Sequence, residues 1–331
     1  MEHQTINDLK IKKMKLHLKS IHTKLLRSAY LLAATCYSVA AVAQTDSSVT
    51  EEPTVQAIKK AKPVKNTFTS IWLIDNQTVM VPVKKTFEMD IMHRFGTIDN
   101  GYKDFYGFFA PSNIRLGFNY VPLNDLMIGV SLTKANMTWE AYAKYALIKQ
   151  TKGRYPVSVT YYGNAAIDTR EEDNFIHSSD RLMYFHQLMI ARKVNDKLSL
   201  QIAPSVSHIN IVNGYFKTVK TESTGPDSVK TVVEGEMEHQ HFAIAFLGRY
   251  RITQSMSVIV NVDQPITKHV ADNPRPNISF GLEVATSSHA FQFFLGNYAY
   301  ITPQRNNYFN QNDYKESQFL IGFNITRLWN Y

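Results

Sequence analysis

The end of the chain constrains its fold more strongly than any other stretch. From Phe319 onward, apolar side chains alternate with small or polar ones until the pattern stops at Trp329, close to the last residue. In an extended strand this alternation places the apolar side chains on one face and the others on the opposite face. A soluble sheet avoids an apolar edge strand of this kind, because an open edge pairs with other chains and aggregates. A closed barrel has no open edge, and its two faces can meet lipid and a polar interior.

The same alternation recurs twelve times along the chain, and most of the stretches have the roughly nine to eleven residues that a tilted membrane strand needs. The stretches are residues 86–95, 113–121, 126–134, 137–147, 156–166, 182–191, 198–208, 239–250, 256–264, 277–286, 289–300 and 318–329. The pattern predicts an all-β fold, a closed antiparallel transmembrane β-barrel of about 12 strands that occupies residues 86–331.

The connections between these stretches alternate in length. Short ones have the sequences VPLND, RKVNDK and RITQS, or lie around Gly153 and at residues 287–288. Longer ones cover residues 96–112, 167–181, 209–238, 265–276 and 301–317, and only the tight connection at Ala135-Asn136 breaks the rule. In bacterial barrels the short turns face the periplasm and the long loops face outward. Both chain ends are therefore predicted on the periplasmic side.

The N-terminal residues predict export. Seven Lys or Arg lie between Lys10 and Arg27, and an apolar run with small residues at its end follows up to Ala43. This arrangement predicts a secretory signal peptide over residues 1–43, with translation starting at Met1 or Met14. An amphipathic surface helix is the alternative. With the barrel pattern, the signal peptide predicts a location in the outer membrane of a Gram-negative cell.

Removal of the predicted signal peptide changes the cysteine count and the net charge of the exported chain. Cys36 is the only cysteine, so the mature chain has no disulfide, thiolate metal site or cysteine nucleophile. Residues 1–43 carry a net charge of +5 of the total +8, which leaves +3 for the exported protein. This small excess gives no support to nucleic-acid binding.

Two segments precede the barrel. Residues 44–67 are polar and without periodicity, which predicts a disordered periplasmic linker. Residues 68–85 are short and mixed, and Pro82 argues against a central strand. The sequence leaves open whether residues 68–85 form a pre-barrel segment or a plug.

Three motifs carry a resemblance to a known family. They are HRFG at residues 93–96, FYG at residues 105–107 and NIRLG at residues 113–117. They resemble an uncharacterised outer-membrane β-barrel family of Bacteroidota, a domain of unknown function, and the resemblance spans roughly residues 70–331. It implies an outer-membrane barrel. It implies no activity and no catalytic residue.

Polar side chains on the predicted strands alternate with the apolar face, so they are expected to face the barrel interior. The charged or amide-bearing candidates are Glu88, Asp90, Arg94, Arg115, Asn119, Glu140, Lys144 and Glu283. One interpretation is a charged constriction that selects small polar solutes. The other is a set of interior salt bridges that fill a narrow barrel and hold it shut.

The aromatic and histidine side chains fit structural roles. Trp72, Trp139 and Trp329 are predicted in belts at the membrane surfaces, although such rings could also stack sugars in the interior. His239 and His241 share a strand face, as ligands in some metal sites do, but a solvated loop end is the expected setting. No metal site and no cofactor are predicted. His93 shares the outward face with Phe95 and is expected near the membrane surface.

An enzyme is the main rival class, because barrel enzymes can hydrolyse lipids with a serine and a histidine. The adjacent pairs Ser207-His208 and Ser288-His289 would point to opposite strand faces, outside hydrogen-bond reach. A Gly-x-Ser-x-Gly motif is also missing from the sequence. We therefore expect no enzymatic activity.

The functional prediction is a narrow pore or binding barrel for small polar solutes. The alternative is a non-conducting structural or adaptor barrel that binds an envelope partner through its long loops or residues 68–85. The expected partners are outer-membrane lipid, the barrel-insertion machinery and a periplasmic or surface protein, with no nucleic acid.

Overall fold

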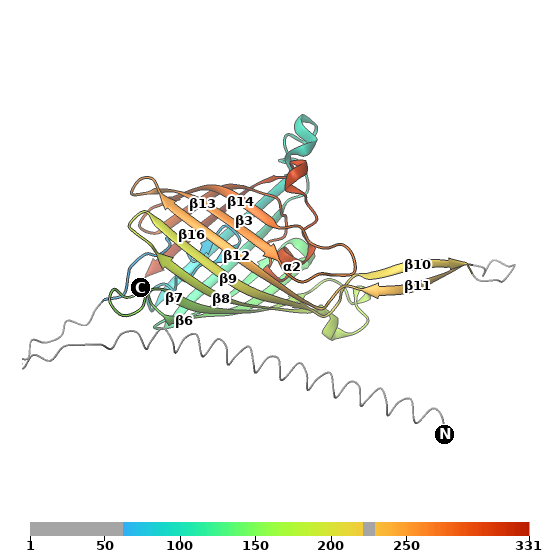
Figure 1. Ribbon diagram of the computed structural model, residues 1–331, viewed down its shortest axis with the longest axis horizontal. Coiled ribbons are helices and arrows are strands. Elements are labelled where there is room, and N and C mark those ends of the chain that lie inside the picture. The colour runs from blue at the N-terminus through green and yellow to red at the C-terminus, as the bar shows by residue number, and fades with distance from the viewer. Residues whose placement is uncertain (1–61, 221–228, 331) are drawn as a thin grey trace, which may run out of the picture. The chain divides into compact units, whose positions relative to one another are not determined.

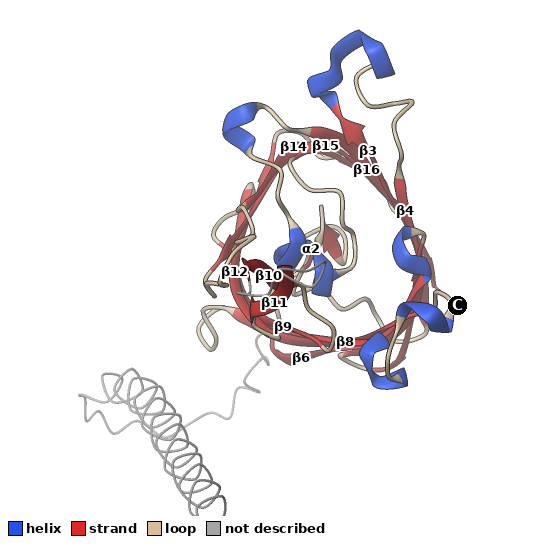
Figure 2. Cartoon of the chain, turned by 90° about the vertical axis from the view of Figure 1, so that its right-hand side faces the viewer, coloured by secondary structure: helices blue, strands red, loops and turns tan. Residues whose placement is uncertain are grey.

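The computed structural model describes residues 62–220 and 229–330, and its main feature is a closed barrel of twelve antiparallel strands (Figures 1 and 2). The strands are β3 (Thr86–Thr97), β4 (Asn113–Leu123), β5 (Leu126–Thr133), β6 (Thr138–Ile148), β7 (Ser158–Asp168), β8 (Leu182–Lys193), β9 (Leu198–Ile209), β12 (Gln240–Arg251), β13 (Met256–Pro265), β14 (Asn277–Ala285), β15 (His289–Gly296) and β16 (Leu320–Asn330). The predicted fold class and strand number are confirmed.

The last strand closes the barrel by pairing with the first. β16 lies antiparallel to β3, and Phe323 and Trp329 stand opposite His93 and Phe87. The rings of Phe87 and Trp329 lie 5.6 Å apart. The apolar C-terminal strand therefore has a partner on both sides, which removes the open edge that its sequence would otherwise present.

Most strand boundaries agree with the predicted stretches, and the largest difference is at the end of β15. The predicted stretch 289–300 ends as a strand at Gly296. The side chain of Asn297 accepts a hydrogen bond from the Ile278 backbone at 2.7 Å and donates one to the Pro276 carbonyl at 2.9 Å. The Asn297 side chain thus binds backbone groups at the start of β14. The hydrogen bonding between β14 and β15 therefore ends there, and the chain turns inward.

The connections differ between the two ends of the barrel. One end, called the turn end below, has the connections 124–125, 149–157, 194–197, 252–255 and 286–288. The other end, called the loop end, has 98–112, 134–137, 169–181, 210–239, 266–276 and 297–319. The predicted alternation of connection lengths is confirmed, including the short exception around Asn136.

The loop end contains ordered elements that the sequence did not predict. A two-stranded ribbon of β10 (Gly214–Lys220) and β11 (Val229–Glu236) extends away from the barrel (Figure 1). The helix α2 (Pro303–Phe309) lies inside the ring of strands (Figure 2). Short 3₁₀ turns complete this end: η2 (Ile98–Asp104), η3 (Ala135–Met137), η4 (Glu172–Asn174), η5 (Ser178–Arg181) and η6 (Tyr314–Glu316). Within the described residues, no helix is long and apolar enough to cross a membrane.

Two of the motif glycines pack against each other where the loop after β3 returns to the wall. The Gly96 backbone N–H donates to the Gly107 carbonyl at 3.0 Å. A β-carbon on Gly107 would lie 2.2 Å from the Gly96 carbonyl oxygen, and Gly107 also has a φ of +85°. The close approach therefore requires glycine at residue 107, which explains why the FYG motif ends in this residue.

The region before the barrel is partly described. The predicted signal peptide, residues 1–43, and most of the predicted linker lie outside the described residues. The last linker residues are ordered: Pro63 forms an antiparallel bridge with Thr151, and the Val64 N–H donates to the Gln150 carbonyl at 2.7 Å. The segment predicted as a disordered linker therefore ends in contact with the turn end of the barrel.

Candidate functional site: the barrel interior

The barrel has an apolar outer face and a polar interior. Exposed side chains on the outer face include Val130, Phe246, Phe280 and Phe293. The predicted interior residues are all buried: Glu88, Asp90, Arg94, Arg115, Asn119, Glu140, Lys144 and Glu283 have at most 3% of their surface exposed. Their direction follows from the strand alternation, as predicted.

Arg115 is the centre of one buried network. Its Nη1 atom donates to Asp90 Oδ1 at 2.6 Å and its Nε atom donates to Glu140 Oε2 at 2.9 Å. Asn119 donates to the second Asp90 oxygen at 2.9 Å, and Ser131 donates to Glu140 at 2.6 Å. The two carboxylates share the one Arg115 guanidinium, and each also accepts a hydrogen bond from a neutral donor. This part of the interior is a salt-bridge network.

The other predicted interior residues belong to separate groups. Arg94 donates to Asn324 Oδ1 at 2.9 Å, and its guanidinium carbon lies 4.5 Å from the centre of the Phe294 ring. Glu283 accepts from the Arg249 Nε atom at 2.7 Å. Glu88 is buried with one oxygen lacking a hydrogen-bond partner. The eight residues therefore do not form a single charged ring, and their role in selecting solutes stays a prediction.

A hairpin from the region before the barrel occupies the interior. It consists of β1 (Trp72–Leu73) and β2 (Asn76–Gln77), and residues 71–79 are almost completely buried. Interior side chains bind its backbone: Gln292 accepts from the Ile74 N–H at 3.0 Å and donates to the Trp72 carbonyl at 2.9 Å. Gln201 accepts from the Val79 N–H at 3.0 Å and donates to the Gln77 carbonyl at 2.8 Å.

Side chains of the hairpin bind further strands. Lys144 of β6 donates from Nζ to Gln77 Oε1 at 2.6 Å. Gln187 of β8 donates to Asn76 Oδ1 at 2.9 Å, and Asn76 Nδ2 donates to Asp263 of β13 at 2.9 Å. Together with the backbone contacts, hydrogen bonds reach the hairpin region from β6, β7, β8, β9, β13, β15 and β16. Residues 71–79 are thus held around most of the circumference.

The prediction that Trp72 lies in a membrane-surface belt is wrong. Its side chain is 1% exposed inside the barrel, and the Arg115 guanidinium carbon lies 4.8 Å from the centre of its ring. Trp72 precedes the first barrel strand, so the strand alternation does not apply to it, and the hairpin carries it inward. Trp139 and Trp329 do lie on barrel strands.

The helix α2 enters from the loop end and meets the hairpin. Gln304 donates to Asn164 of β7 at 2.7 Å, and Arg305 pairs with Asp168 at 3.0 Å. Asn306 is 3% exposed and its side-chain amide donates to the Asp75 carboxylate at the hairpin turn. The interior of the barrel is therefore occupied from both ends, with contact between the two inserts.

Sequence reasoning missed Asp75, Asn76, Gln77 and Asn306 as interior residues. The signal that could have found the hairpin is the polar run Asp75-Asn76-Gln77-Thr78 between two short apolar stretches. The signal for α2 is Pro303 at the first helical turn. Both are short, and neither shows that the element lies inside a barrel.

The histidines take different positions. The His93 ring lies on the outer face, stacked on Phe323 with centroids 5.2 Å apart. His241 is buried and its Nδ1 lies 2.9 Å from His269 Nε2, whereas His239 contacts the Ile209 carbonyl. The described residues contain no group of three or more side chains that could hold a metal ion.

The expectation that neither serine–histidine pair lies within hydrogen-bond reach is wrong for Ser288 and His289. Ser288 Oγ lies 3.1 Å from His289 Nδ1, within hydrogen-bond reach. Ser288 belongs to the turn between β14 and β15, so the opposite-face argument for strand neighbours does not hold there. The His289 ring stacks on Phe291, and among the described residues no carboxylate hydrogen-bonds to it. That the protein is not an enzyme stays a prediction.

The family described as a membrane bound beta barrel domain (DUF5777) matches residues 68–329. The chain belongs to this family. The match covers the hairpin as well as all twelve barrel strands of this DUF5777 protein, and it confirms the predicted membership of a β-barrel family of unknown function. The prediction of a membrane barrel is confirmed with it.

Two solved structures are similar to this chain over most of its length. The DUF5777 protein is similar to the NanC porin, with 9% identity and a TM-score of 0.41 over 74% of this chain and 99% of that chain. It is also similar to an outer membrane channel from Pseudomonas putida F1, with 13% identity and a TM-score of 0.43 over 76% and 97%. No curated protein matches the sequence.

Proposed function

We propose that this protein is an outer-membrane barrel with a polar interior for small polar solutes, and that residues 68–79 close it in the state described. The barrel pattern, the predicted signal peptide and the membrane-bound family support the location. The hairpin and α2 occupy the space that a solute would need. Passage therefore requires both the hairpin and α2 to move, and binding requires at least one of them to move.

One observation carries the proposal: interior side chains bind the hairpin backbone as they would bind a polar ligand. Gln292 and Gln201 each accept one N–H and donate to one carbonyl of the hairpin. Asn324 donates to the Ile74 carbonyl. Amides that present a donor and an acceptor together suit hydroxyl and amide groups of small solutes. When the hairpin leaves, water or solute can satisfy the same groups, because such exchanges change the free energy little.

A disulfide that joins residue 70, just before the hairpin, to the barrel wall tests whether residues 68–79 close the barrel. Ser70 Oγ lies 3.3 Å from Thr326 Oγ1 of β16, and the predicted mature chain has no cysteine that would compete. The Ser70→Cys/Thr326→Cys variant, refolded in planar bilayers, should stay closed when oxidised and show openings when reduced. A variant lacking both residues 68–79 and residues 303–309 should conduct steadily. The matched control is Ser70→Ala/Thr326→Ala, which cannot be locked by oxidation.

The alternative is a non-conducting adaptor barrel. It is favoured by the apolar side chains of the hairpin region, since Phe68, Trp72 and Leu73 pack in the main buried cluster of the barrel. A variant that lacks residues 68–79 and 303–309 and still migrates as a folded barrel on a gel, but does not conduct, would exclude the solute barrel and support the adaptor. Equal conductance of the oxidised and reduced cysteine variant would exclude the closing role of the hairpin.

A further inference from the structure

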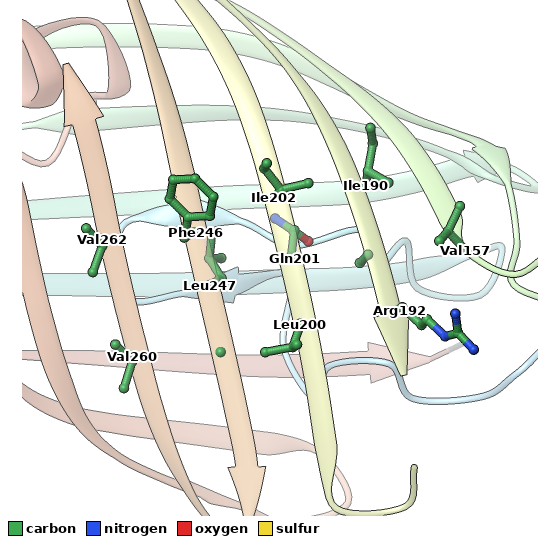
Figure 3. A pocket seen from close by; sticks show the side chains of 12 residues that line it. Val157, Ile190, Arg192, Leu200, Gln201, Ile202, Phe246, Leu247, Val260 and Val262 are labelled. Carbon is green, nitrogen blue, oxygen red and sulfur yellow. The ribbon is translucent and has the colours of Figure 1, made fainter. Parts of the chain in front are cut away.

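The outer face of the barrel carries an apolar groove near the turn end. It runs across β8, β9, β12 and β13 and has a volume of about 490 Å³ (Figure 3). Its walls include Ile190, Leu200, Ile202, Phe246 and Val260. All five are aliphatic or aromatic, so the groove suits a hydrocarbon chain.

The groove exists because one outward-facing position has no side chain. Gly248 follows Phe246 and precedes Tyr250 on the outer face of β12, and those two rings are 48% and 49% exposed. A β-carbon on Gly248 would meet only Leu200 Cδ2, at 3.8 Å. Space is therefore free at Gly248, and a larger side chain there would fill the groove without disturbing the wall.

The groove leads into a polar hollow at the turn end. Arg192 lines both the groove and this second hollow, which has a volume of about 460 Å³ and also includes Lys152, Arg154 and Tyr155. None of the residues that line the second hollow is acidic. Three cationic side chains thus surround one hollow at the end of a hydrocarbon groove.

Within residues 62–220 and 229–330, these three cations have no acidic partner, unlike their neighbours. Lys149 pairs with Asp125, and Lys193 lies 3.9 Å from Asp196. Among the described residues, Lys152, Arg154 and Arg192 take part in no ion pair. Uncompensated cations close together attract an anion that carries several acceptor oxygens.

We propose that the groove and the hollow together bind one anionic glycerophospholipid. An acyl chain lies in the groove over Gly248, and the phosphate lies among Lys152, Arg154 and Arg192. Each buried methylene group and each basic side chain near the headgroup contributes to such binding. The predicted orientation places the turn end at the periplasmic leaflet, which consists of phospholipids. This site is separate from the interior and does not depend on whether the barrel conducts.

Native mass spectrometry of the refolded mature protein tests the site. The protein is released from micelles that contain phosphatidylglycerol, phosphatidylethanolamine or glycerol phosphate without acyl chains. One phosphatidylglycerol should remain bound, with at least about tenfold lower occupancy for phosphatidylethanolamine, and glycerol phosphate should not remain. An Arg154→Ala/Arg192→Ala variant should lose the preference for the anionic lipid. A Gly248→Leu variant should lose bound lipid of either kind.

Two control variants distinguish the proposed site from general effects of a substitution on lipid retention. Lys197→Ala removes a cation from another turn of the same end, and Val284→Leu enlarges an outer-face side chain away from the groove, so neither should change lipid retention. Each variant is first checked for a folded barrel by its unheated gel mobility. Equal retention by the double arginine variant and the unmodified protein would overturn the headgroup site. Undiminished retention by folded Gly248→Leu would overturn the groove. Retention of glycerol phosphate would show that a free phosphate compound, rather than a lipid, is bound.

Discussion

Asn306 of α2 donates a hydrogen bond to the carboxylate of Asp75 at the tip of the interior hairpin. The two residues belong to inserts that enter the barrel from opposite ends, and the same carboxylate also accepts from Tyr298 at 2.7 Å and from Asn261 at 2.8 Å. Asp75 is therefore the point where the hairpin, the helix and the barrel wall are joined. Loss of this one carboxylate should loosen both inserts.

Asp75→Ala tests this junction. The change leaves the donors of Tyr298, Asn261 and Asn306 without their acceptor in a buried place, which should lower the free energy of unfolding by about 1–3 kcal/mol. Urea titration followed by gel mobility measures the loss, and bilayer recordings should show brief openings. Asp99→Ala, at an exposed position in η2, is the control and should change neither. Unchanged stability of Asp75→Ala would contradict a joining role.

Arg115→Ala should be the most destabilising interior change. It leaves the buried carboxylates of Asp90 and Glu140 without their cation, which costs about 3–5 kcal/mol for a buried pair of this kind. Equilibrium unfolding in urea is the measurement. Arg251→Ala, at the turn end of β12, serves as the matched control. In a variant that lacks residues 68–79 and 303–309, Arg115→Ala should also make the current more cation-selective. Unchanged selectivity there would argue against a charged constriction.

Gly117 of the NIRLG motif should not tolerate a side chain. A β-carbon at this position would lie 2.3 Å from the Asp90 carboxylate, which crosses β4 to reach Arg115. Gly117→Ala is expected to displace Asp90 and to lower the free energy of unfolding by about 1–3 kcal/mol. Gly248→Ala is the matched control, since its new methyl group meets open space, and it should stay within about 0.5 kcal/mol of the unmodified protein.

Acidification should weaken the loop end through His269. The Glu238 N–H donates to His269 Nδ1 at 3.1 Å, so the neutral ring carries its proton on Nε2 and donates to His241. Burial lowers the pKa of His269, against the opposing charge of Glu238. The neutral His269 ring contributes to the free energy of unfolding at pH values above the ordinary histidine pKa of about 6.5. This contribution is lost as the pH falls from there toward the pKa of His269 in the folded protein. Tyr308 of α2 packs on the same ring, with centroids 5.0 Å apart.

The measurement is the urea midpoint at pH 7.5 and at pH 5. The unmodified protein should lose stability between these values, and His269→Gln should lose less. His177→Gln, at an exposed loop position, should behave like the unmodified protein. A His269→Gln variant with the full pH dependence would assign the effect to His241 or another group.

The wall of the barrel could be predicted because its signal is local. Successive side chains on a strand such as β3 point alternately inward and outward. The sequence alone therefore assigns Asp90 to the interior and Phe87 to the outer face. The same rule predicts an inward direction for the eight interior candidates, and all eight are buried. It cannot tell that Arg115 pairs with Glu140 of β6, since that pairing depends on the stagger of neighbouring strands. Nor can it tell that Asp90 reaches Arg115 across the space left by Gly117.

The sequence by itself determined a twelve-strand closed barrel, its two kinds of connection and the direction of its side chains, because strand alternation repeats every two residues. Only the tertiary structure decided that the barrel is filled. The contacts that hold the hairpin join residues far apart in the chain, as between Ile74 and Gln292, and no local pattern encodes them. Trp72 shows the difference: its chemistry suits a membrane surface, yet the fold places it against Arg115 in the interior.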